Sequence, residues 1–144
     1  MSEDSARAQV TLSTETIHNP KEPRHFMRIK PVAGRVRVLR NGEVLAESYR
    51  ALRLIEAGKD VYDPTIYMPA DDVRAKLKPT DKKTFCPLKG HAIYFDLLSE
   101  RGDSKAAEIA WSYRETFDFA AELKDYVAFY GAQVVVEEHP AAAS

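Results

Sequence analysis

The chain has 144 residues, of which 44% are hydrophobic and 10% aromatic, enough for the core of one domain but too few for two comfortable ones. Its 21 basic and 22 acidic residues give a formal net charge of -1, which argues against nucleic acid or an anionic membrane surface as a partner. No apolar segment approaches the roughly 20 residues of a membrane span, and the first residues lack the pattern of a signal peptide. We therefore expect a cytoplasmic protein, and the single cysteine fits a reducing compartment.

Periodic apolar patterns fill the middle of the chain and are missing from its ends. Residues 1–25 are polar and carry two prolines, which predicts an extended or partly ordered arm; residues 26–138 predict a single β-rich domain, and residues 139–144 a tail. His18 and His25 flank the proline-bearing segment. We interpret both as exposed or locally hydrogen-bonded histidines that belong to no site.

The domain reads as mainly β with two short helices. Alternating or β-branched segments predict strands at residues 35–39, 44–48, 51–56, 61–69, 83–85, 91–98, 106–113, 127–130 and 133–137, the fourth as an edge strand and the last two as a hairpin-like pair. Asn41-Gly42 predicts a tight hairpin because both residues tolerate positive φ. Helices are predicted from Asp71 or Asp72 through Leu77, and over residues 119–126.

Two acidic residues allow both a structural and a functional interpretation. Alternation places Glu56 on the same strand face as Leu52 and Leu54, so it is either a buried acid with a raised pKa or a solvated strand end. Asp72 is either the cap of the first helix or a catalytic acid. Capping alone explains its residue type and its place.

Reactive and charged side chains are most concentrated around the turn Cys86-Pro87-Leu88-Lys89-Gly90. Lys89 could stabilise a Cys86 thiolate, with His91 as a base, although a buried structural cysteine explains the same position. Lys89 is alternatively an anchor for an anionic ligand or a solvated turn residue. Tyr67, Tyr94 and Trp111 supply either an aromatic floor for a planar or cationic ligand or ordinary core packing.

Several of these segments together resemble a known family. The pattern consists of Arg35-Val36-Arg37-Val38, Ala46-Glu47-Ser48, Tyr67-Met68-Pro69-Ala70-Asp71-Asp72-Val73, the run from Thr84 to Tyr94, Ala110-Trp111-Ser112-Tyr113 and Val127-Ala128-Phe129-Tyr130. It resembles the bacterial and fungal family catalogued as domain of unknown function 427. Database labels sometimes call this family a nucleotidyltransferase domain, but the chain has no glycine-rich phosphate loop beside paired carboxylates.

The resemblance implies a compact antiparallel β-tent or barrel-like single domain. It maps the family's residues onto Glu56, Tyr67, Pro69, Asp72, Thr84, Cys86, Pro87, Lys89, Gly90, Ala92, Tyr94, Trp111, Phe129 and Tyr130. The chain departs from the family's usual pattern at Leu88 and Ile93, so the resemblance does not fix the walls of a cleft. Tent-like domains that hold zinc use paired cysteine motifs, and one cysteine cannot supply them; we expect no metal and no cofactor.

Three functions fit these residues. The first is a binding domain for a small anionic or nucleotide-like molecule, with a cleft that contains Lys89, Tyr67, Tyr94, Trp111, Glu56 and Asp72. The second is a cysteine-dependent or acid/base enzyme that uses Cys86 and Lys89 in the same cleft. The third is an interaction or homodimerisation domain that works through a sheet edge.

Overall fold

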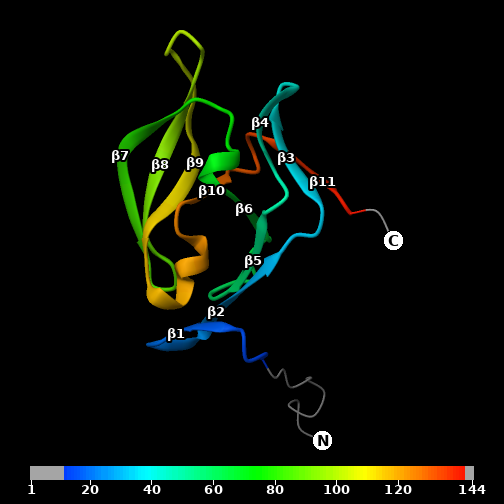
Figure 1. Cartoon of the computed structure of the whole chain (residues 1–144). Coiled ribbons are helices and arrows are strands. Elements are labelled where there is room, and N and C mark those ends of the chain that lie inside the picture. The colour runs from blue at the N-terminus through cyan, green and yellow to red at the C-terminus, as the bar shows by residue number, and fades with distance from the viewer. Residues whose placement is uncertain (1–11, 142–144) are drawn as a thin grey trace, which may run out of the picture.

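Two antiparallel β-sheets build the molecule (Figure 1), and the computed structural model describes residues 12–141. Eight strands form the larger sheet, in the order β1-β2-β5-β6-β10-β9-β8-β7, and three form the smaller one, in the order β11-β3-β4. The strands are β1 (Ile17–Asn19), β2 (Glu22–Pro31), β3 (Arg35–Arg40), β4 (Glu43–Ser48), β5 (Leu52–Ala57), β6 (Thr65–Pro69), β7 (Leu77–Cys86), β8 (Gly90–Leu98), β9 (Ser104–Thr116), β10 (Tyr126–Phe129) and β11 (Val135–His139). Two 3-10 helices, η2 (Ala70–Asp72) and η3 (Asp118–Leu123), complete the described elements. None of the helices within residues 12–141 could cross a membrane.

The larger sheet bends between β6 and β10. One half contains β1, β2, β5 and β6, the other contains β10, β9, β8 and β7. Side chains from the two halves meet across the bend, since Lys89 at the β7–β8 turn binds Glu56 on β5. The sheet ends at β1 and β7 and is not closed into a barrel. The single, mainly β domain that the sequence predicts is confirmed.

Two apolar cores lie on opposite faces of the central strands. The intersheet core fills the space between the two sheets and contains Val32, Val36, Val38, Leu45, Ala46, Ala51, Met68, Phe95, Leu97, Ala106, Ile109, Ala110, Val127 and Phe129. The aromatic core fills the bend of the larger sheet and contains Met27, Leu52, Leu54, Tyr67, Leu88, Ala92, Tyr94, Tyr113, Ala120, Leu123 and Ala128. Strand β8 contributes side chains to both cores because its successive side chains point to opposite faces. Ala92 and Tyr94 belong to the aromatic core, and Phe95 and Leu97 belong to the intersheet core. Both faces of this strand are therefore buried.

The Asn41-Gly42 hairpin is confirmed. Both residues have positive φ, 50° and 79°, and they connect β3 to β4. Glycine adopts this conformation without strain and asparagine tolerates it better than most residues. The hairpin pairs Arg40 with Glu43 and fixes the register of the smaller sheet.

The structure corrects four expectations about the elements. The helix expected through Leu77 is only the short η2, which has no side-chain cap, and Leu77 already belongs to β7. The helix expected over residues 119–126 is the 3-10 segment η3, since Tyr126 pairs with Pro69 in the sheet instead. Strand β6 is not an edge strand because it lies between β5 and β10, and the expected pair 127–130 and 133–137 belongs to two different sheets.

The segment predicted as an N-terminal arm contains both β1 and the start of β2. β1 pairs with β2, and β2 pairs with β5 from Phe26 to Pro31. Residues 1–11 and 142–144 lie outside the described part of the chain, so the first part of that arm and the end of the predicted tail are not described.

Candidate functional site

The turn between β7 and β8 folds inward. Leu88 is fully buried in the aromatic core, and the backbone N–H of Lys89 donates to the carbonyl of Cys86 at 3.2 Å. Gly90 follows with φ of 122°, and a Cβ there would lie 2.1 Å from the carbonyl oxygen of Glu115. Only glycine therefore allows the backbone of this turn to approach β9 so closely.

The inward turn buries the ammonium of Lys89 against a carboxylate. The Lys89 side chain retains 8% of its exposure and Glu56 retains 13%, and Nζ donates to Glu56 Oε1. The other carboxylate oxygen, Oε2, lies 2.8 Å from His25 Nε2 on β2. The ammonium also lies 5.8 Å from the ring centroid of Tyr113. These contacts join four parts of the chain: β2, β5, the β7–β8 turn and β9.

The pKa of Glu56 reflects two opposing effects. Burial would raise it, but the charge and the hydrogen bonds of Lys89 and His25 outweigh burial and lower the pKa below its ordinary value of 4.5. Glu56 is therefore neither the solvated strand end nor the acid with a raised pKa that the sequence left open. It is an ionised carboxylate with two partners.

The three aromatic residues of the predicted floor lie in the aromatic core or pack against it. Trp111 Nε1 donates to Tyr67 Oη at 3.2 Å, and Tyr94 Oη shares a hydrogen bond of 2.9 Å with Thr84 Oγ1. Burial raises the pKa of Tyr67 and of Tyr113 far above the ordinary 10.0. Both remain neutral phenols near Glu56.

Cys86 packs half-buried against the aromatic core. Within residues 12–141, no hydrogen bond joins its thiol to a base, and His91 instead lies with its ring 5.0 Å from that of Phe85. Asp72 contacts neither Cys86 nor the ion pair: it accepts from Ser48 Oγ at 2.5 Å and lies 3.6 Å from Arg50. The structure thus pairs Glu56 with Lys89 and Tyr67 with Trp111, and it leaves Asp72 elsewhere.

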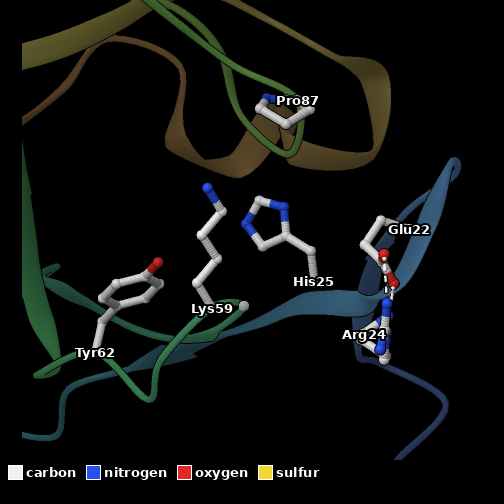
Figure 2. Close-up of a pocket in the computed structure, with 7 residues that line it drawn as sticks. Glu22, Arg24, His25, Lys59, Tyr62 and Pro87 are labelled. Atoms are coloured by element: carbon white, nitrogen blue, oxygen red, sulfur yellow. Dashed lines mark hydrogen bonds and ion pairs between the residues drawn. The ribbon is translucent and has the colours of Figure 1, made fainter.

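A groove of about 700 Å³ opens above the ion pair, between β2, the β5–β6 loop and the β7–β8 turn. We call it the basic groove; Glu22, Arg24, His25, Gly58, Lys59, Tyr62 and Pro87 line it. Figure 2 shows Lys59 and His25 side by side, pointing toward Pro87, with Tyr62 beside Lys59. Arg24 pairs with Glu22 at 3.0 Å. Lys59 has no ion-pair partner among the residues that the structure describes.

His25 connects the groove to the buried pair. It lines the groove and binds Glu56 through Nε2, and its Nδ1 lies 3.4 Å from Asn19 Nδ2. A Cβ at Gly58 would lie 3.1 Å from the His25 ring, so the backbone of the β5–β6 loop packs directly on it. The ring is thus held on three sides.

The family model described as Domain of unknown function (DUF427) matches residues 28–139. The chain belongs to this family. No curated protein matches it. In this DUF427 domain Glu56, Lys89, Tyr67 and Trp111 lie inside the matched region, whereas Glu22, Arg24 and His25 of the groove precede it.

Sequence reasoning missed every charged or aromatic lining residue of the basic groove, namely Glu22, Arg24, His25, Lys59 and Tyr62. A signal existed for His25, which alternates with Met27 and Ile29 on one face of β2 and therefore points toward the aromatic core. Lys59 and Tyr62 lie in a polar loop without periodicity. Only the folded arrangement reveals their role.

Among residues 12–141, no three histidine, cysteine or acidic side chains gather closely enough to hold a metal ion. The site brings together cationic side chains, a histidine–carboxylate pair and aromatic rings.

Proposed function

We propose that this DUF427 domain binds a small anionic molecule, such as a phosphate or carboxylate compound, in the basic groove. The observation that carries the proposal is the ammonium of Lys59, which lies beside His25 in a groove of about 700 Å³ and has no ion-pair partner in the described chain. Pockets of this size accommodate small organic ligands. A charge-assisted hydrogen bond to an anion is stronger than a neutral one.

The proposal moves the anion anchor from Lys89 to Lys59. The Lys89 ammonium is buried and bound to Glu56, so an anion would have to compete with a carboxylate that is already in place. Lys59 and Arg24 both line the groove, and Tyr62, which is 44% exposed, offers a ring for a planar part of the ligand. The proposed ligand is thus anionic at one end and planar at the other.

We also propose that the protein acts in the cytoplasm, as the sequence predicts.

Calorimetric titration with inorganic phosphate, adenosine monophosphate and citrate tests the proposal. At least one of these should bind the wild type, and Lys59→Gln should weaken that binding by about tenfold because it removes a charge-assisted contact. The matched control is Lys124→Gln, an exposed lysine outside the groove. Binding that is equal in both variants, or absent from the wild type, would rule the proposal out.

One observation favours an acid/base enzyme as a second candidate. The hydrogen bond between His25 Nε2 and Glu56 Oε2 is the kind of contact that orients a catalytic imidazole, and Nδ1, which lies 3.4 Å from Asn19 Nδ2, is the nitrogen that would serve a ligand after exchanging that contact. If a ligand of the basic groove is turned over, His25→Gln should abolish turnover while changing the dissociation constant little. Turnover that survives in His25→Gln would remove this candidate.

A further inference from the structure

A second groove, of about 530 Å³, opens beside β6, β10 and β11. We call it the tryptophan groove; Asp63, Ile66, Trp111, Phe129, Val136 and Glu138 supply its charged and larger apolar lining. The groove lies apart from the basic groove, with which it shares no lining residue. Its size also suits a small organic molecule.

The lining of the tryptophan groove carries negative charge only. Asp63 and Glu138 line it, and none of the described residues that line it is a lysine, arginine or histidine. Glu138 binds Arg53 on β5, whereas Asp63 takes part in no ion pair or hydrogen bond within residues 12–141. One carboxylate thus remains free to meet a cation at the edge of an apolar groove.

The aromatic wall is held in place from two sides. The indole N–H of Trp111 donates to Tyr67, and the ring of Tyr130 lies 4.7 Å from the indole at an interplanar angle of 51°. Such contacts fix the orientation of the indole before any ligand arrives. An indole face attracts cations through its quadrupole, and tryptophan does so better than other aromatic residues.

We propose that the tryptophan groove binds a compact organic ammonium ion, with the charged group between Asp63 and Trp111 and the apolar body against Ile66 and Phe129. Within the described residues, an anion would meet the unpaired carboxylate of Asp63 and no positive lining residue, while Glu138 is already paired with Arg53. A neutral apolar molecule would gain the contacts with Ile66 and Phe129 but would gain no charge interaction with Asp63. The charge of the lining therefore selects a cation.

The chain provides its own reporter because Trp111 is the only tryptophan. The experiment titrates choline chloride into the full-length protein and follows tryptophan fluorescence, with sodium chloride as the control for ionic strength. A parallel titration uses 3,3-dimethyl-1-butanol, which has the shape of choline without its charge. Choline should give a saturable change, and the alcohol should require at least about fivefold higher concentrations.

Three variants complete the test. Asp63→Asn keeps the shape of the side chain and should weaken choline binding by about fivefold while leaving the titration with the alcohol unchanged. Asp118→Asn, an exposed position that does not line the groove, should bind choline like the wild type. Lys59→Gln should also bind choline like the wild type, since it alters only the basic groove. The absence of saturation, equal affinity for choline and the alcohol, or unchanged choline affinity in Asp63→Asn would each overturn the proposal.

Discussion

The basic groove and the tryptophan groove are supported by different contacts with the aromatic core, and the tryptophan groove also touches the intersheet core through Val38 and Phe129. Under the basic groove, His25 binds Glu56, which forms the buried ion pair with Lys89. Under the tryptophan groove, Trp111 donates a hydrogen bond between neutral groups to Tyr67. One groove is thus supported by charges and the other by aromatic rings, although both supports reach the same set of buried side chains.

This difference governs what each support contributes to stability. A buried ion pair has lost most of its hydration, so the removal of one partner leaves a charge that is only partly satisfied. A neutral hydrogen bond leaves only a dipole without a partner, and its loss costs less. Substitutions below the basic groove should therefore affect folding more than equivalent substitutions below the tryptophan groove.

The largest effect is expected from Gly90→Ala, which disturbs the turn that carries Lys89. Its Cβ would meet the Glu115 carbonyl at 2.1 Å, at a φ of 122°. Backbone strain and overlap together should lower the free energy of unfolding by about 4 kcal/mol. Chemical denaturation measures this loss.

The matched control is Gly102→Ala, at φ of 92° with nothing within 4 Å of the added Cβ. It carries the strain without the overlap and should lose only about 1–2 kcal/mol. Equal losses in the two variants would show that the close approach to β9 is not what requires Gly90.

Lys89→Ala should destabilise the domain by about 3 kcal/mol, because it leaves the Glu56 carboxylate half-buried with His25 as its only remaining partner. Urea denaturation at neutral pH measures the change. Lys59→Ala is the matched control and should change stability by less than about 0.5 kcal/mol, since Lys59 is exposed. The double variant Glu56→Leu with Lys89→Met should recover much of the loss; no recovery would contradict a penalty that arises from the unpaired charge.

The sequence predicts most strands of this fold because local patterns determine them. The alternation that places Glu56 with Leu52 and Leu54 holds, since both leucines are buried in the aromatic core and Glu56 faces Lys89 there. The Asn41-Gly42 turn also follows from the φ preferences of two neighbouring residues. Such features need no knowledge of distant parts of the chain.

The site was harder to predict because it depends on contacts between distant segments. Pro87 and Gly90 correctly indicate a turn, yet Lys89 is not the solvated turn residue that the sequence allowed, because the bend of the sheet brings the turn onto β5. Lys89 and Glu56 are 33 residues apart in sequence. The predicted helix at 119–126 fails for a similar reason: Tyr126 fits a helical period but finds a sheet partner in Pro69.

The next largest effect expected after Lys89→Ala is on the pH dependence of the free energy of unfolding. The pKa of Glu56 is below 4.5 in the folded protein, so unfolding raises the affinity of this carboxylate for protons. Glu56 therefore contributes stability above its unfolded pKa of about 4.5, and this contribution is lost as pH falls through the lower, folded value. Urea denaturation at several pH values should show a smaller loss below about pH 4.5 in Glu56→Gln than in the wild type. Parallel curves for the two proteins would contradict the assignment.

Tyr67→Phe is expected to have the smallest effect and tests the support of the tryptophan groove. It removes the phenol oxygen that accepts the hydrogen bond from Trp111 Nε1 and leaves the ring volume unchanged. The loss should be about 1 kcal/mol, because Trp111 is only half-buried and its N–H regains part of the bond from water. Tyr49→Phe is the matched control: it removes the phenol oxygen of a ring that is 71% exposed, so it should cost no more than Tyr67→Phe and should leave the Trp111 emission spectrum unchanged. Since Trp111 is the only tryptophan, a spectral change confined to Tyr67→Phe would locate the effect at this bond. If both variants change the spectrum equally, or if Tyr67→Phe destabilises the domain as much as Lys89→Ala, the distinction between a charged and a neutral support is wrong.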